Sequence, residues 1–262
     1  MVKSQSTNLS DLPVEWLTVP VQPARAIAVR RRSGQGTPLV WIGGFRSDMM
    51  STKALALDAL AARLGLPMIR FDYAAHGESP GAFEAMTLSD WLADTLAVLA
   101  SLQDQPPLLI GSSMGGWISL LAVRARHRLG LRAPKGLVLI APAVDFSEEL
   151  MWNAFPDVVK NTIIEKGVYH QPSLYGDPYP ITKNFIEDGR KNLLFGSPIE
   201  AHAPVHILQG MKDDAVPPTH AQRLVDHMPT TDVTLTYVPD GDHRLSRPQD
   251  IALLERVVTR MI

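Results

Sequence analysis

The chain has 262 residues, of which 45% are hydrophobic and 20% charged, and its formal net charge is -2. This composition is typical of a globular domain, and the length fits one large domain or one domain with an insertion. The balanced charge gives no basic field to attract nucleic acid. The absence of cysteine excludes disulfides, a thiolate nucleophile and cysteine-ligated metal sites.

No targeting or membrane-spanning signal is evident in the sequence. No apolar run reaches the roughly 18 residues that a transmembrane helix needs. Residues 1–16 lack the apolar segment of a secretory signal, and their acidic residues are unusual in a transit peptide. We therefore predict a cytoplasmic protein without a membrane span.

Short apolar runs alternate with longer amphipathic ones along most of the chain, which indicates strands and helices in turn. The predicted strands are residues 38–43, 67–73, 107–110, 136–141, 204–209 and 233–238. The predicted helices are residues 52–64, 88–102, 114–129, 218–228 and 248–262, with Thr87 as a candidate N-cap. Residues 14–32 favour one or two antiparallel edge strands. The pattern predicts an α/β fold, a mostly parallel sheet with helices on both faces.

Residues 145–200 interrupt this alternation and predict a cap inserted into a core made of residues 1–144 and 201–262. Two helical stretches, 147–166 and 182–195, flank a loop rich in Pro and Tyr. The insertion contains many aromatic residues and leaves from the C-terminal end of a strand, where open α/β sheets place their ligands. An ordinary packed insertion would also fit. The candidate substrate-binding residues are Trp152, Phe155, Tyr175 and Phe185.

A candidate nucleophile lies where the third predicted strand meets a helix. Residues 111–115 read Gly-Ser-Ser-Met-Gly and fit G-x-S-x-G, the motif of a tight strand–turn–helix that exposes its central serine. Small residues two positions before and after the serine let neighbouring elements approach. This register selects Ser113, because Ser112 would be flanked by the larger Ile110 and Met114. Ser112 is interpreted as a capping or packing hydroxyl.

A serine hydroxyl needs a base, and the base needs a carboxylate that orients it. On this topology both follow the nucleophile, in the order Asp and then His. Residues 210–217 follow a strand and select Asp213, with Asp214 as the alternative. His243 is the one histidine after the last predicted strand, and its neighbour Asp242 is a weaker candidate acid.

Two backbone N–H groups are expected to form an oxyanion hole for the tetrahedral intermediate. One belongs to Met114, directly after the nucleophile. The other is expected from the glycine-rich loop after the first core strand, with Phe45 preferred and Arg46 as its neighbour. His76, in a Gly/Ser-rich loop, remains open as a contact near the site.

The three loops together resemble those of the α/β-hydrolase superfamily of serine hydrolases. Within it the chain is most similar to the mitochondrial palmitoyl-protein thioesterase and acyl-glucuronide esterase group. The similar stretches are residues 51–56, 69–73, 111–117, 210–217 and 242–244. The resemblance implies an α/β-hydrolase fold and carries that family's triad onto Ser113, Asp213 and His243. The chain departs from the group at its N-terminus, which lacks a mitochondrial presequence.

The sequence therefore predicts an esterase or thioesterase that acts through an acyl-serine on a small-molecule or acyl-protein substrate. This chemistry needs no metal or organic cofactor. Hydrolysis of a C–C bond on the same triad is an alternative, as is a ligand-binding homologue that has lost turnover. The oligomeric state is left open.

Overall fold

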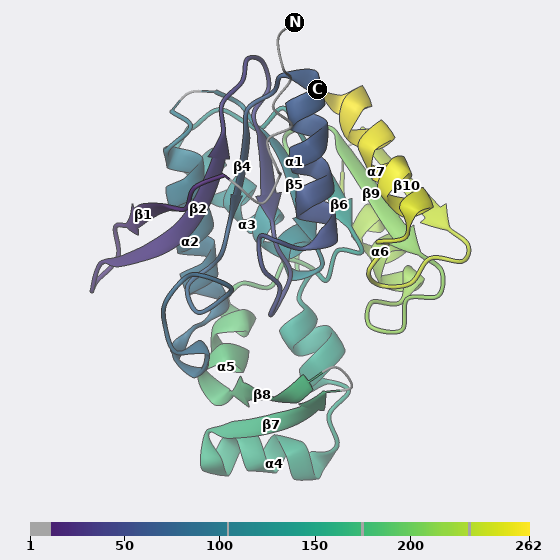
Figure 1. Ribbon diagram of the computed structural model, residues 1–262. Coiled ribbons are helices and arrows are strands. Elements are labelled where there is room, and N and C mark those ends of the chain that lie inside the picture. The colour runs from purple at the N-terminus through teal and green to yellow at the C-terminus, as the bar shows by residue number, and fades with distance from the viewer. Residues whose placement is uncertain (1–11, 104, 174–175, 230–231) are drawn as a thin grey trace, which may run out of the picture.

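The central sheet explains why the apolar runs alternate with helices. A computed structural model describes residues 12–103, 105–173, 176–229 and 232–262, and within them eight strands form one sheet in the order β1-β2-β4-β3-β5-β6-β9-β10 (Figure 1). The strands are β1 (Glu15–Val19), β2 (Arg25–Arg32), β3 (Leu39–Ile42), β4 (Met68–Phe71), β5 (Leu108–Ser112), β6 (Gly136–Ile140), β9 (Val205–Gly210) and β10 (Val233–Val238). β2 pairs antiparallel with β1 and β4, and the other neighbours pair in parallel. The predicted α/β fold and the antiparallel strands within residues 14–32 are confirmed.

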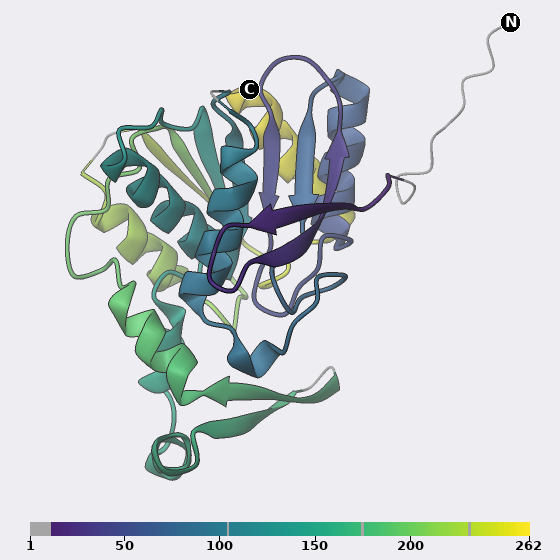
Figure 2. The same ribbon diagram turned by 90° about the vertical axis from the view of Figure 1, so that its left-hand side faces the viewer.

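Helices cover both faces of the sheet, with α1 and α7 on one side and α2, α3 and α6 on the other (Figure 2). They are α1 (Thr52–Leu64), α2 (Leu88–Ala100), α3 (Met114–Arg128), α6 (Pro218–Asp226) and α7 (Pro248–Met261). Successive strand side chains point to opposite faces. In β3, Leu39 and Trp41 pack into the core beneath α1 and α7, whereas Val40 and Ile42 join the core beneath α2 and α3. Two buried cores thus hold the parallel strands rigidly.

Local sequence signals set the ends of these helices. Thr87 caps α2: its side chain accepts a hydrogen bond from the N–H of Asp90, and its own N–H donates to the Asp90 carboxylate. Gly65 ends α1 in the left-handed conformation, with φ of 68°, which glycine adopts without steric cost. The predicted cap at Thr87 is confirmed.

The segment between β6 and β9 extends beyond one end of the sheet (Figure 1). It contains the helical turn η3 (Ser147–Trp152), α4 (Asp157–Lys166), the antiparallel hairpin β7 (Val168–Ser173) and β8 (Gly176–Thr182), and α5 (Lys183–Lys191). The region predicted as a Pro/Tyr-rich loop is therefore a hairpin in the described residues. A two-stranded ribbon has two edge strands, where proline is tolerated because its missing N–H can face away from the partner.

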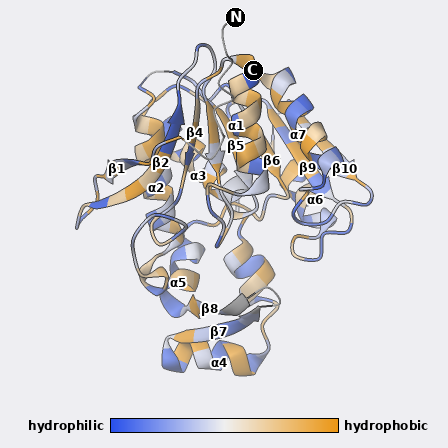
Figure 3. Cartoon of the chain, in the orientation of Figure 1, coloured by the Kyte–Doolittle hydropathy of each residue, from blue (hydrophilic) through white to orange (hydrophobic). Residues whose placement is uncertain are grey.

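Surface helices show the amphipathic pattern expected of a packed layer. Apolar and polar residues alternate along α4 and α7 in Figure 3. Among the helices of the described residues, none is long and apolar enough to cross a membrane.

Candidate active site

Ser113 lies in a strained turn between β5 and α3. Its backbone φ is 54°, a left-handed value that is uncommon for any residue except glycine. A Cβ on Gly115 would lie 2.0 Å from the carbonyl oxygen of Ile42, and one on Gly111 would lie 2.4 Å from that of Gly115. Only glycine fits at either position, so the close packing around the turn explains the spacing of the G-x-S-x-G motif.

The structure brings Ser113, His243 and Asp213 together, although they come from three separate loops. The hydroxyl of Ser113 is 3.1 Å from Nε2 of His243, and Oδ2 of Asp213 is 2.8 Å from Nδ1 of the same ring. The Asp213 side chain is fully buried, whereas that of His243 is 30% exposed. In the tautomer with its proton on Nδ1, the ring donates to Asp213 and accepts from Ser113.

Asp213 is held as an ionised acceptor. Its Oδ1 accepts hydrogen bonds from the N–H groups of Ala215 and Val216, at 2.9 and 2.7 Å, and its Oδ2 accepts one from the side-chain amide of Gln209. Burial alone raises the pKa of Asp213, but the hydrogen bond and charge of His243, with those from Val216 and Gln209, hold that pKa below its usual value. Asp213 is thus poised to fix the ring and its proton.

The alternative acids lie elsewhere. Asp214 is exposed. Asp242 is also exposed, and its carboxylate accepts a hydrogen bond from the N–H of Leu245, which closes a local turn. Sequence reasoning missed Gln209, which is fully buried at the end of β9. An amide side chain at the end of a largely apolar strand, directly before the acid loop, was the available signal.

The loop after β3 approaches the nucleophile closely. A Cβ on Gly44 would lie 3.3 Å from the carbonyl oxygen of Ser112 and 3.4 Å from Cβ of Ser113. Met114 is the first residue of α3, where backbone N–H groups have no partner within the helix. The N–H of Arg46 donates to Nε2 of His76 at 3.0 Å. Of the two candidate donors in the loop, Arg46 is therefore already engaged.

Two cavities meet at Ser113 and His243. One, of about 590 Å³, is lined by polar groups of the loop after β3 and of α1, among them Asp48, Thr52 and Lys53. The other, of about 550 Å³, lies against the segment between β6 and β9. Its apolar lining consists mainly of Phe45, Phe146, Leu150, Met151, Phe155 and Tyr179. The nucleophile thus faces a polar space on one side and an apolar space on the other.

The predicted substrate-binding residues take different positions. Phe155 lines the apolar cavity. Phe185 is buried against the Phe45 ring, with centroids 5.5 Å apart, and packs the inserted segment onto the core. Trp152 does not belong to the described lining; Arg190 and Lys160 lie over its ring. Tyr175 lies outside the described residues. Leu150 and Met151 are not aromatic, so the aromatic enrichment of the segment did not indicate them.

A metal site finds no support in the described part of the chain, where no group of three or more His, Asp or Glu residues is arranged to hold an ion. The side chains around Ser113 are those that line the two cavities, from the loop after β3, α1 and the segment between β6 and β9.

Comparison with known proteins places the chain in a family. Residues 34–252 match the alpha/beta hydrolase family. The chain belongs to that family. This alpha/beta hydrolase is 34% identical over 240 residues to the mitochondrial palmitoyl-protein thioesterase ABHD10 of Homo sapiens, an alignment that covers 90% of this chain and 76% of the relative. The similarity that the sequence motifs implied is confirmed.

Solved structures agree with this assignment. The hydrolase superposes on a putative hydrolase from Agrobacterium vitis S4 with a TM-score of 0.90 and 45% identity, covering 95% of this chain and 99% of the other. It superposes on the mouse alpha/beta hydrolase domain-containing protein 10 with a TM-score of 0.84 and 31% identity, covering 95% and 98% of the two chains. The likeness therefore includes the inserted segment as well as the sheet.

Proposed function

We propose that this hydrolase cleaves carboxylic esters or thioesters through an acyl-serine intermediate. The observation that carries the proposal is the continuous contact from Ser113 through His243 to the buried Asp213. A nucleophile, a base and an orienting carboxylate in hydrogen-bond contact are the arrangement that activates a serine hydroxyl.

The reaction follows from this geometry in two steps. His243 Nε2 takes the proton of Ser113 as Oγ bonds to the acyl carbon, and Asp213 stabilises the imidazolium that forms. The proton then passes to the leaving oxygen or sulfur as its bond to the acyl carbon breaks. In the second step His243 deprotonates water, which attacks the acyl-serine, and the proton returns to Ser113 as the acid departs.

The N–H groups of Phe45 and Met114 form the proposed oxyanion hole. Gly44 lets the first loop approach Ser113, and the start of α3 supplies an N–H free of helical bonding together with the positive end of the helix dipole. Donors fixed in advance stabilise the negative charge that develops on the substrate oxygen.

The two cavities suggest how an acyl substrate binds. The apolar cavity beneath residues 145–200, which act as a cap in this account, suits a hydrocarbon acyl chain, and the polar cavity suits the leaving group. The human relative is named a palmitoyl-protein thioesterase, which supports a long acyl chain and a thioester among the candidate substrates.

A panel of oxygen esters and matched thioesters, with acyl chains from two to sixteen carbons, tests this function. We expect the wild type to hydrolyse members of both series with release of the free acid, and Ser113→Ala to be inactive on all of them. Ser112→Ala is the matched control and should remain active. Failure of the wild type on the whole panel, or turnover by Ser113→Ala, would refute the proposal.

A further inference from the structure

The loop after β4 binds the backbone of the loop after β3 at three points. The hydroxyl of Tyr73 donates to the carbonyl oxygen of Gly43 at 3.1 Å, and the carboxylate of Asp72 accepts the N–H of Met49 at 2.6 Å. Between these two bonds, Nε2 of His76 accepts the N–H of Arg46 at 3.0 Å. The loop after β4 therefore fixes the backbone conformation of the loop after β3.

The His76 bond acts beside the proposed oxyanion donor. Arg46 directly follows Phe45 and has a φ of 58°, so the backbone turns sharply at this point. A non-glycine residue keeps such a φ only where its surroundings fix it. On the other side of the donor, the Phe45 ring packs against Phe83 and Trp91. The Phe45 side chain is thus held by its packed ring, and the next peptide, from Phe45 to Arg46, by the bond to His76.

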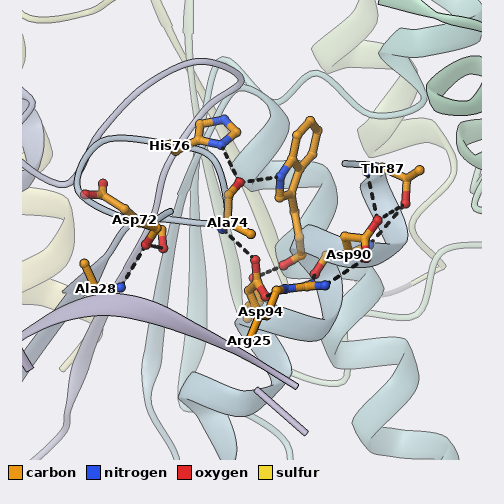
Figure 4. Close-up of polar contacts among 11 residues, drawn as sticks. Arg25, Ala28, Asp72, Ala74, His76, Thr87, Asp90 and Asp94 are labelled. Carbon is orange, nitrogen blue, oxygen red and sulfur yellow. Dashed lines mark hydrogen bonds and ion pairs between the residues drawn. The ribbon is translucent and has the colours of Figure 1, made fainter. Parts of the chain in front are cut away.

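The neighbours of His76 set its tautomer. Figure 4 shows its ring beside the carbonyl of Ala74, to which Nδ1–H donates at 3.2 Å. The indole N–H of Trp91 donates to the same carbonyl, and the N–H of Ala74 binds the carboxylate of Asp94 at 2.8 Å. With its proton committed on Nδ1, the ring has a lone pair on Nε2, which the Arg46 N–H needs.

The charge state of the ring agrees with this role. His76 is 4% exposed, and its ring meets that of Trp91 edge to face, with centroids 5.1 Å apart. Burial lowers the pKa of His76 to about 4, although the bond to Ala74 opposes this effect. The ring is therefore neutral near pH 7 and keeps its acceptor. His243, not His76, is in hydrogen-bond contact with the Ser113 hydroxyl.

We propose that His76 is a positioning residue of the oxyanion hole, which fixes the turn at Arg46 so that the neighbouring Phe45 N–H meets the substrate oxygen. This inference rests on the proposed function. Removal of a whole oxyanion donor costs about 10²- to 10³-fold in kcat. Loss of the His76 bond leaves the Phe45 donor present but poorly held, so kcat should fall by less, on the order of 10- to 100-fold.

Two amide variants distinguish the role of Nδ1 from that of Nε2. His76→Asn can still donate to Ala74 but is too short to reach Arg46, whereas His76→Gln places an amide oxygen near the position of Nε2 and keeps the acceptor. His76→Phe keeps a ring among Trp91, Phe83 and Tyr73 but removes both bonds. His220→Phe is the matched control, because His220 is also buried, bonded to a backbone carbonyl and packed on a phenyl ring.

For each folded variant we would measure kcat, KM and the affinity for two inhibitors, an alkyl boronic acid and an ether of the same shape. Thermal melts record stability. An alkyl boronic acid forms a tetrahedral adduct with Ser113, and the matching ether has no carbonyl oxygen. We expect His76→Asn and His76→Phe to lower kcat and boronate affinity by the same 10- to 100-fold, with KM and ether affinity changed less than about threefold. His76→Gln should recover most of kcat, and His220→Phe should lose stability alone.

Other results decide against the proposal. An unchanged kcat in folded His76→Asn or His76→Phe would overturn it. So would an equal loss of affinity for the boronate and the ether. A kcat that follows the melting temperature across all four variants would also overturn it, because it would show a purely structural role. If the wild type is active and Ser113→Ala is not, such a result removes the role of His76 and leaves the proposed function standing. If the wild type neither turns over an ester nor binds the boronate, the proposed function itself fails.

Discussion

The ammonium group of Lys53 on α1 donates a hydrogen bond to the backbone carbonyl oxygen of Arg244, the residue after His243. A second, longer contact of 3.4 Å joins it to the hydroxyl of Ser246. Lys53 is 8% exposed. A buried side chain on a core helix thus ties down the loop that presents the catalytic imidazole of the proposed mechanism. Burial lowers the pKa of Lys53 to about 8, although the charge of Asp242 opposes this shift.

This buried lysine should make stability depend on alkaline pH. Between about pH 8 and the ordinary lysine pKa of 10.5, the unfolded chain holds a proton that the folded chain has released. The free energy of unfolding of the wild type, relative to Lys53→Met, should therefore rise across this window by up to about 3 kcal/mol. Urea unfolding at several pH values measures it. Lys166→Met, at an exposed lysine of α4, is the control. If the unfolding free energy of the wild type relative to Lys53→Met were as independent of pH as that relative to Lys166→Met, the lowered pKa of Lys53 would be contradicted.

Asp213→Asn should lower kcat/KM by on the order of 10⁴, because an amide at this position favours the wrong imidazole tautomer. Asp214→Asn and Asp242→Asn change exposed carboxylates that make no contact with the ring in the described structure, so they should stay within about tenfold of the wild type. Ester hydrolysis by the three variants compares them directly. If Asp214→Asn lost activity while Asp213→Asn kept it, the orienting carboxylate would be Asp214 and the assignment to Asp213 would be wrong.

Gly115→Ala should both destabilise the protein and slow it. The new methyl group would overlap backbone oxygens of the loop after β3, since its Cβ would lie 2.0 Å from Ile42 O and 2.6 Å from Gly43 O. Overpacking of this kind costs about 1–3 kcal/mol. Its relief would move the two loops that carry the proposed oxyanion donors apart. Urea melts and kcat measure the two effects. Gly196→Ala, where a Cβ meets open space, should change neither.

The apolar cavity predicts a dependence on acyl length. Each buried CH₂ contributes about 0.8 kcal/mol, or roughly fourfold in kcat/KM, until the cavity is filled. Phe155→Ala should move the length at which kcat/KM stops rising, without loss of activity on acetyl esters. Trp152→Ala, in the same segment but away from the described cavity lining, should leave that length unchanged. A flat series in the wild type would contradict an acyl site here.

Local patterns predicted the sheet and the turn at Ser113 because their causes are local. Continuous apolar runs mark parallel strands buried on both faces, and only glycine fits beside Ser113 at positions 111 and 115. The hairpin of β7 and β8 was missed because its prolines read as a loop. The role of His76 depends on its bond to Arg46, 30 positions away in the sequence, and that of Gln209 on how the loop after β9 folds back onto its side chain. Periodicity reports neither. The division into core and cap and the cytoplasmic location stay predictions.

Aromatic content could locate the inserted segment but could not sort its residues. Phe155 faces the cavity while Phe185 packs against Phe45, and both are phenylalanines in helical stretches of the same segment. The difference arises from how the segment sits on the sheet, which the sequence pattern leaves open.

The central claim is that Ser113 is an activated nucleophile. Reaction with a fluorophosphonate, followed by mass spectrometry of the modified peptide, tests it most directly, because only a serine with a working base and oxyanion site reacts rapidly. We expect an adduct on Ser113 in the wild type and in Ser112→Ala, and no adduct in Ser113→Ala. An unlabelled wild type, or an adduct on any other residue, would contradict it.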